Sequence, residues 1–290
     1  MVEKTKKILV TGAQGKLGGA LCGILAPFYE VICIDAKDCD ITDKKAVEKF
    51  FKDLFIDAVV HCAAYTDVDK AEDEPERAFS INAEGTKNIL NNLKNKNCLF
   101  VYISTDYVFD GKKKQAYTEN DEPNPLGAYG HSKLEGEKIV ENFVSHVILR
   151  TSWLFGPGGK NFVATILRLA NEKKTIEMVK DEVGSPTYTL DLAKAVKVLL
   201  DIYFKKGLDY GVYNVTNSGK CSRLEFAEYI TKSADLKTVF IPIVSSQSTR
   251  KAKRPQNSLL SNDKFISLTS HRLPSWQEAV RHYLEHSKNE

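Results

Sequence analysis

The chain has 290 residues, with 41 Lys and Arg against 38 Asp and Glu, and a formal net charge of +3. This length allows one large α/β domain, or a main domain with a smaller companion. The nearly balanced charge argues against a nucleic-acid tract, and no apolar stretch approaches the roughly 18 residues of a membrane span. The amino-terminal residues are too polar for a signal peptide, so we expect a cytoplasmic protein that binds neither nucleic acid nor membrane.

Six cysteines, at positions 22, 33, 39, 62, 98 and 221, show no C-x-x-C spacing. Cys33, Cys62 and Cys98 lie in or beside apolar runs that are typical of strands. Buried free thiols explain them better than disulfides or a zinc site. No compact cluster of metal-ligand residues is visible, and we predict no metal site.

Apolar runs alternate with helical patterns in the first half of the chain. The predicted strands cover residues 7–11, 31–35, 57–61, 99–103 and 147–150. Predicted helices follow the first strand to about Leu25, run from Asp43 to about Leu54 with Thr42 as N-cap, and run from Pro75 to Leu93. Strands that are apolar on both faces and separated by helices predict an α/β fold, a doubly wound parallel sheet of the Rossmann type.

From about Trp153 this alternation loosens into short loops, a Ser-rich stretch and isolated helices. We therefore predict two interleaved parts. Residues 1–151 and about 187–216 would form a dinucleotide-binding Rossmann domain. Residues about 152–186 and 217–290 would form a smaller substrate-binding lobe.

A glycine-rich turn, T-G-A-Q-G-K-L-G at residues 11–18, follows the first predicted strand and opens the first helix. Glycines there let backbone N–H groups approach a pyrophosphate at a helix N-terminus. The spacing is G-x-x-G-x-x-G rather than G-x-G-x-x-G. The position of the turn, after a strand and before a helix, therefore supports dinucleotide binding more strongly than the glycine spacing does. Asp35 ends the second strand, where an acid binds ribose hydroxyls and favours NAD(H). Lys16 and Lys37 could relieve repulsion of a 2′-phosphate, which leaves NADP(H) open.

Tyr129 and Lys133 are four residues apart, so they share one face of a helix. A nearby ammonium favours the phenolate, and we expect Lys133 to lower the pKa of Tyr129 into the range for proton transfer near neutral pH. Ser104 and Thr105 follow the fourth strand directly. A Thr105 hydroxyl there could bind a substrate carbonyl while Tyr129 protonates it and Lys133 holds the nicotinamide ribose.

Four further segments complete a resemblance to a known family: 63–72 (AAYTDVDKAE), 104–111 (STDYVFDG), 150–156 (RTSWLFG) and 254–258 (RPQNS). With the features above, they resemble the extended short-chain dehydrogenase/reductase family over essentially the whole chain. The similarity is strongest to the branch that reduces the C4 ketone of a dTDP-linked 6-deoxysugar. The resemblance implies an NAD(P)H-dependent oxidoreductase of nucleotide-sugar biosynthesis with Thr105, Tyr129 and Lys133 as catalytic residues.

The resemblance also implies which residues bind the ligands. For the cofactor these are Gly12, Gln14, Gly15, Lys16, Leu17, Asp35, Asp40, Ile41, Ala63, Ala64 and Tyr65, together with Tyr129 and Lys133. For the nucleotide sugar they are Thr105, Asp106, Tyr107 and Trp153 at the sugar and Arg254 at the phosphates. Structural roles compete: the aromatic residues could pack the lobe, and Arg254 could be a surface charge.

Three other functions remain open within this resemblance. The 4,6-dehydratases of the family carry an acid after Thr-Asp, whereas this chain has Tyr107. The epimerases return the hydride to their own substrate and keep the cofactor. The regulatory subunit of methionine adenosyltransferase resembles the same reductases, so a partner-binding role needs a direct test. A homodimer is also left open.

Overall fold

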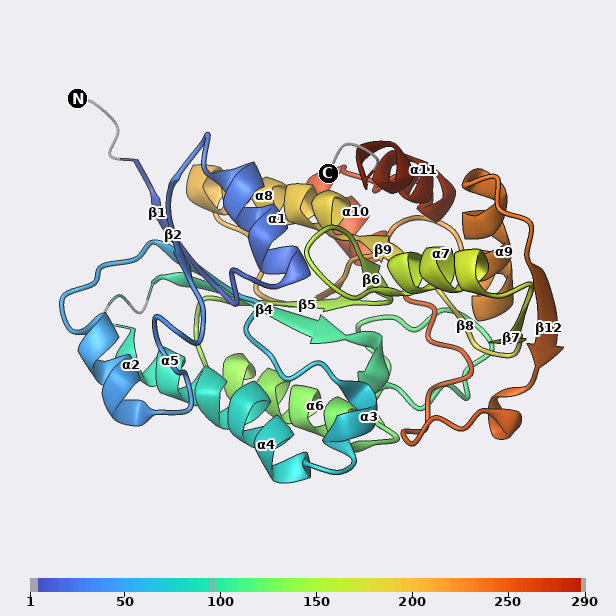
Figure 1. Ribbon diagram of the computed structural model, residues 1–290. Coiled ribbons are helices and arrows are strands. Elements are labelled where there is room, and N and C mark those ends of the chain that lie inside the picture. The colour runs from blue at the N-terminus through green and yellow to red at the C-terminus, as the bar shows by residue number, and fades with distance from the viewer. Residues whose placement is uncertain (1–4, 94, 96, 288–290) are drawn as a thin grey trace.

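The computed structural model describes residues 5–93, 95 and 97–287. Its centre is a parallel sheet in the strand order β10-β5-β4-β3-β1-β2 (Figure 1). The strands are β1 (Lys7–Thr11), β2 (Glu30–Ile34), β3 (Ala58–His61), β4 (Leu99–Thr105), β5 (His146–Thr151) and β10 (Gly211–Asn214). The five predicted strands are all present, and the predicted doubly wound α/β fold is confirmed.

Helices cover both faces of this sheet (Figure 1). One face carries α1 (Lys16–Leu25), α8 (Thr189–Lys206) and α10 (Asp263–Thr269), whose apolar side chains share one core with the strands. The other face carries α2 (Lys44–Phe51), α4 (Pro75–Phe79), α5 (Thr86–Asn92) and α6 (Ala128–Glu141). Because both faces are covered, the central strands are apolar throughout, and every residue of β4 is buried.

The strand order sets the place of a crevice. β1 has β2 on one side and β3 on the other, so the chain runs from β1 to β2 in one direction and then crosses back past β1 to β3 in the other. At such a switch point, the carboxyl ends of the strands leave an opening in which doubly wound proteins bind ligands. Thr11 and His61, which end β1 and β3, are register partners at this opening.

Two predicted helices differ in detail from the structure. The helix predicted over residues 75–93 contains a π-helical segment, η1 (Ser80–Gly85), between α4 and α5. The prediction of Thr42 as N-cap is wrong, because the Asp43 carboxylate accepts hydrogen bonds from the first N–H groups of α2. The Thr42 hydroxyl instead donates to Asp40 Oδ1 at 2.8 Å.

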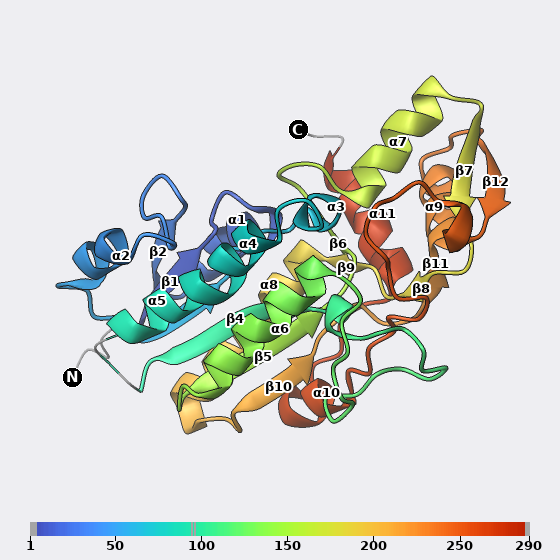
Figure 2. The same cartoon turned by 90° about the horizontal axis from the view of Figure 1, so that it is seen from below.

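The remaining elements gather beyond the carboxyl ends of the sheet strands (Figures 1 and 2). Three helices, α7 (Phe162–Glu172), α9 (Arg223–Ser233) and α11 (Trp276–Ser287), contribute to a second apolar core rich in aromatic residues. Short strand pairs join them: β6 (Leu154–Phe155) with β9 (Thr187–Tyr188), β7 (Thr175–Val179) with β12 (Val239–Ile243), and β8 (Val183–Gly184) with β11 (Cys221–Ser222). We call this group the lobe.

Three short helical segments complete the described chain: α3 (Val68–Ala71), η2 (Asp106–Val108) and η3 (Ser245–Gln247). The division into two domains stays a prediction. Helix α10 falls in the range predicted for the lobe, yet it packs with α8 on the sheet. Within the described residues, no helix is both long enough and apolar enough to cross a membrane.

The prediction of free cysteines is wrong for Cys22 and Cys33. Cys33 forms a disulfide with Cys22 of α1, with 6.4 Å between their Cα atoms. β2 is the edge strand of the sheet, and Cys33 is exposed there rather than buried. Cys98 is a buried free thiol as predicted, and Cys62 is free but only half-buried.

Candidate active site

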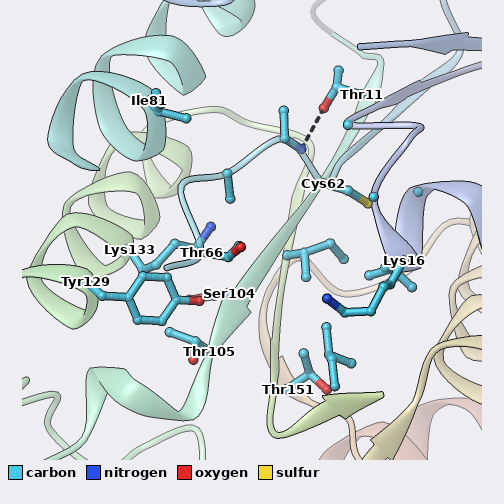
Figure 3. A pocket seen from close by; sticks show the side chains of 18 of the residues that line it. Thr11, Lys16, Cys62, Thr66, Ile81, Ser104, Thr105, Tyr129, Lys133 and Thr151 are labelled. Atoms are coloured by element: carbon cyan, nitrogen blue, oxygen red, sulfur yellow. Dashed lines mark hydrogen bonds between the residues drawn. The ribbon is translucent and has the colours of Figure 1, made fainter. Parts of the chain in front are cut away.

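A cavity of about 720 Å³ opens at the carboxyl ends of the sheet strands, between the sheet and the lobe (Figure 3). All the predicted ligand-binding residues line it except Tyr65 and Arg254. Residues from the glycine turn, from the ends of β3, β4 and β5, from α6 and from the lobe therefore meet around one space. The sequence separates these segments widely, and the sheet topology brings them together.

The glycine turn forms the cofactor half of the cavity wall. Gly12 has φ +66°, and a Cβ there would lie 2.7 Å from the backbone N of Ala63. A Cβ on Gly18 would lie 2.1 Å from the carbonyl oxygen of Gly12. The backbone therefore approaches closely from both sides, as a turn that cradles a pyrophosphate requires.

The N-terminus of α1 fits the same ligand. Its N-cap is Gly15, which supplies no side-chain hydrogen bond to the first N–H groups of the helix. These donors and the positive end of the helix dipole lie beside the cavity, since Gly15, Lys16 and Leu17 all line it. The residues present thus fit the diphosphate of a dinucleotide.

Asp35 lies next to this turn and is joined to it by a hydrogen bond. Its Oδ2 accepts from the backbone N of Gln14 at 2.9 Å, and its Oδ1 accepts from the backbone N of Ala36 at 2.8 Å. Lys16 reaches the lobe, where its Nζ donates to the carbonyl oxygen of Lys160 at 3.1 Å. Burial lowers the pKa of Lys16.

Other predicted cofactor residues lie along the same wall. Asp40, Ile41, Ala63 and Ala64 line the cavity. Tyr65 does not, because its ring faces α4: its hydroxyl donates to Glu74 Oε2 at 3.4 Å and its backbone N donates to Asn82.

The three predicted catalytic residues come together at the centre of the cavity. Thr105 is the last residue of β4, and Tyr129 and Lys133 lie in the first turns of α6. Figure 3 shows their side chains on one side of the cavity. The Thr105 hydroxyl lies close enough to Tyr129 to lower the pKa of its phenol, and Lys133 Nζ lies 3.9 Å from the ring centroid of Tyr102.

The predicted effect of Lys133 on Tyr129 is wrong in this structure. Burial raises the pKa of Tyr129, and the charge of Asp106 raises it further, against the lowering effect of the Thr105 hydroxyl. Burial also lowers the pKa of Lys133 to about 7, which the charge of Glu137 opposes. Both groups are desolvated together, so Tyr129 keeps its proton, which is the form that can donate to a developing alkoxide.

A buried ion pair lies behind this centre. Glu137, one turn after Lys133 on α6, faces Arg150 of β5 with 2.6 Å between Oε2 and Nη2. The Ser104 hydroxyl also donates to Glu137. This pair fixes α6 against β4 and β5, so the spacing between Thr105 and the helix is set by a charged contact inside the protein.

The lobe side of the cavity carries the predicted substrate residues. Asp106 is 1% exposed and its Oδ2 has no hydrogen-bond partner in the described part of the chain. Burial raises the pKa of Asp106 to about 6. The Tyr107 ring packs edge-on against the Tyr129 ring with centroids 5.6 Å apart. Trp153 has φ +48°, a conformation that a bulky residue adopts only when its surroundings hold it.

Two arginines near this side differ in their position relative to the cavity. Arg254 lies outside the cavity lining, and its guanidinium binds both carboxylate oxygens of Asp69 at 3.1 and 2.8 Å. Arg223, which no motif indicated, lines the cavity. In the sequence it opens α9 inside a capping box of Ser222 and Glu225, a structural signature that says nothing of a ligand.

Comparison with known proteins agrees with the fold. Residues 6–289 match the family model described as the RmlD substrate binding domain. The spore coat polysaccharide biosynthesis protein SpsK of Bacillus subtilis is 41% identical over 96% of this chain and 97% of its own length. A dTDP-4-dehydrorhamnose reductase of Aggregatibacter actinomycetemcomitans is 36% identical over 95% of this chain and 97% of its own.

Two solved structures that resemble this chain come from proteins with the same name as the second of these relatives. A dTDP-4-dehydrorhamnose reductase from Clostridium acetobutylicum superposes with a TM-score of 0.91 at 39% identity, covering 97% of this chain and 99% of that one. The Bacillus anthracis dTDP-4-dehydrorhamnose reductase, in complex with NADP, has a TM-score of 0.91 at 36% identity with the same coverage. The chain therefore belongs to the family of the RmlD substrate binding domain, the dTDP-4-dehydrorhamnose reductases, which are NAD(P)-dependent oxidoreductases.

Proposed function

We propose that this chain reduces the C4 ketone of dTDP-4-dehydro-L-rhamnose to give dTDP-L-rhamnose. The observation that carries the proposal is the meeting of Thr105, Tyr129 and Lys133 on one cavity whose far wall is the glycine turn. Relatives named dTDP-4-dehydrorhamnose reductase, 36% and 32% identical over nearly the whole chain, support the choice of substrate.

The residues of this chain would act in a simple order. The N-terminus of α1 and the glycine turn would hold the dinucleotide, and a bound reduced nicotinamide supplies a hydride. Tyr129, kept neutral by burial, would donate its proton to the sugar O4 as negative charge develops there. Thr105 would hydrogen-bond the same oxygen, since donors aimed at developing charge supply a large part of the rate in such sites. Lys133 would hold the nicotinamide ribose beside them.

Elimination of water is less well supported than reduction. The residue after Thr105 and Asp106 is Tyr107, which lines the cavity and whose pKa is raised by burial. Such a phenol is a poor replacement for the carboxylic acid that the related dehydratases use. The proposal is therefore a net reduction in which the oxidised cofactor leaves.

The preference between NADH and NADPH is part of the proposal. Asp35 beside the turn supports NADH, because a carboxylate repels a 2′-phosphate. The relative from Bacillus anthracis was solved with NADP, which supports NADPH. Asp35 already accepts two backbone hydrogen bonds, so its charge is partly compensated. We propose that the enzyme accepts both, with NADPH used at least as well as NADH.

The test is oxidation of NADH and NADPH by the purified chain with a panel of nucleotide 4-ketosugars. We expect one cofactor oxidised per dTDP-4-dehydro-L-rhamnose reduced, with identification of the product by its sugar stereochemistry. Conversion without net cofactor oxidation would indicate an epimerase. Oxidation only with another sugar nucleotide would keep the reductase and change its substrate, an outcome that the similarity to SpsK makes worth including.

The regulatory alternative is decided by the same preparation. If no panel member is reduced while the chain binds methionine adenosyltransferase tightly, the proposal is wrong and the partner-binding role is favoured. Turnover at ordinary enzymatic rates with any of the 4-ketosugars would contradict a purely regulatory role.

A further inference from the structure

Arg223 places a positive charge on the lobe wall of the cavity. It is the first residue of α9, and its side chain is only 13% exposed. Its guanidinium carbon lies 3.4 Å from the ring centroid of Trp153. It also acts electrostatically on Asp106 and Tyr107, the residues that directly follow Thr105. The charge therefore lies near the proton-transfer centre, on the side away from the glycine turn.

The acid that faces Arg223 is largely engaged elsewhere. Glu182 is 2% exposed, and both its carboxylate oxygens accept hydrogen bonds from the Arg250 guanidinium. Arg223 approaches the same carboxylate only to 3.8 Å, through Nε. Two guanidinium groups thus share one buried carboxylate. Burial disfavours the charged form of Arg223, so a further anion would stabilise it.

The other cations around the cavity have different places. Among the described residues that line it, the basic side chains are Lys16, Lys133 and Arg223. Lys16 belongs to the glycine turn and Lys133 to the catalytic helix. Under the proposed function, the nucleotide sugar occupies the lobe half of the cavity, and Arg223 is the basic side chain among the described residues that line this half.

The stacked geometry suits a phosphate ligand. Trp153 covers one flat face of the guanidinium, and stacking leaves the N–H groups at its edge able to donate in the guanidinium plane. A planar fork of N–H donors matches phosphate oxygens better than a point charge does. The partly buried position strengthens such a contact relative to one in water.

We propose that Arg223 binds the diphosphate of the nucleotide-sugar substrate, with its guanidinium held in place by stacking on Trp153. This inference rests on the proposed function for the identity of the substrate. It reassigns the role that the sequence had suggested for Arg254. The Arg254 guanidinium is bound to both oxygens of Asp69, and its side chain lies outside the cavity lining.

The test is calorimetric titration of thymidine diphosphate, thymidine monophosphate and thymidine into the wild-type chain and an Arg223→Gln variant. We expect thymidine diphosphate to bind about 10- to 100-fold more weakly to the variant, because a hydrogen-bonded charge contact is lost. Thymidine should bind both proteins within about twofold. The dissociation constant for NADPH, measured in parallel, should not change.

Two further variants keep the proposal falsifiable if Arg223→Gln folds poorly. Arg223→Lys keeps the charge and loses the planar fork, so thymidine diphosphate should bind a few-fold more weakly, by roughly 3- to 10-fold. Arg168→Gln, on the exposed face of α7 where Arg168 pairs with Glu172, is the matched control for removing one lobe arginine. Its affinity for thymidine diphosphate should equal that of the wild type.

Three results would overturn the inference. Unchanged affinity for thymidine diphosphate in both Arg223 variants would remove it. An equal loss for thymidine and its diphosphate would show that Arg223 only positions Trp153. Loss of diphosphate affinity in Arg254→Gln, with none in Arg223→Lys, would return the role to Arg254. Failure of the proposed function is separate, because it is read from cofactor oxidation by the wild-type chain.

Discussion

Glu137 and Glu182 are two buried carboxylates that meet arginine in different ways. Glu137 faces Arg150, and these two side chains are 1% and 4% exposed, away from the cavity. Glu182 is shared by Arg250 and Arg223, whose side chains are 30% and 13% exposed. The Glu137–Arg150 contact, which we call the closed pair, lies wholly inside the protein. The Glu182 contact, which we call the shared carboxylate, leaves the Arg223 guanidinium at the cavity wall. The same pair of residue types thus serves packing in one place and a binding surface in the other.

The closed pair also influences the chemistry. Because Glu137 lies one turn from Lys133, its charge raises the pKa of Lys133 against the effect of burial. Under the proposed function, the Glu137–Arg150 pair would influence catalysis through the position and charge of Lys133. The Glu182 carboxylate would instead act through Arg223, on the substrate side of the cavity.

The largest effect is expected on the chemistry that the closed pair supports. Tyr129→Phe removes the proton donor and should lower kcat by about 10²- to 10⁴-fold, the usual contribution of a positioned acid. NADPH binding, followed by fluorescence, should stay within a few-fold of the wild type. Undiminished turnover would show that the proton comes from another group.

Removing one partner from each carboxylate contact should separate their structural roles. Glu137→Gln leaves Arg150 buried without its counter-charge and should lower the free energy of unfolding by about 3–5 kcal/mol. Glu182→Gln should lower it by about 1–3 kcal/mol, because Arg250 can turn toward solvent. Urea denaturation of the two variants checks the order. An equal loss in both would remove the contrast between a closed and a shared pair.

The cofactor wall is built from backbone rather than from charge, so a methyl group should be enough to damage it. Gly12→Ala places a Cβ 2.7 Å from Ala63 N at φ +66° and should lower the free energy of unfolding by on the order of 3 kcal/mol. Gly23→Ala, on α1 where a Cβ meets no atom within 4 Å, is the matched control. It should be neutral or stabilise by up to about 1 kcal/mol. Thermal and urea unfolding of both variants measure the difference.

Asp106 is a third buried carboxyl group, and its titration should make the free energy of unfolding depend on pH. Burial raises its pKa to about 6, so the folded protein binds one more proton than the unfolded chain between pH about 4 and 6. The free energy of unfolding should therefore fall as pH rises through this window, by roughly 2–3 kcal/mol from this group. Asp106→Asn should lack that fall. A constant difference between variant and wild type across these pH values would contradict the raised pKa.

The parts of the molecule that depend on local pattern were predictable. Five sheet strands, the glycine turn, and the order Thr105, Tyr129, Lys133 follow from apolar runs and short spacings that the chain carries within each segment. The position of Arg223 at the cavity wall was not predicted. It depends on the contact with Trp153, which lies far from Arg223 in the chain and meets it only in the folded protein.

Other misses have equally physical reasons. The apolar run at β2 predicted burial of Cys33, but an edge strand leaves one position open to solvent. The pKa of Tyr129 depends on how much water reaches it, and spacing in the chain carries no such information. The site roles of Tyr65 and Arg254 rested on resemblance and stay predictions, and both side chains lie outside the cavity lining.

The π-helical segment η1 has a consequence for tolerance to changes in chain length. It carries Asn82, whose Oδ1 accepts from the backbone N of Tyr65 at 2.8 Å and whose Nδ2 donates to Ser132 Oγ at 2.9 Å. The extra residue of a π-turn sets the rotation of everything before it relative to everything after it. Deleting one residue within Ser80–Gly85 would restore an ordinary helix and rotate Asn82 away from these partners. The loop that carries Tyr65 and the catalytic helix would then lose the hydrogen bonds that join them through Asn82. This would happen although Thr105, Tyr129 and Lys133 were all unchanged.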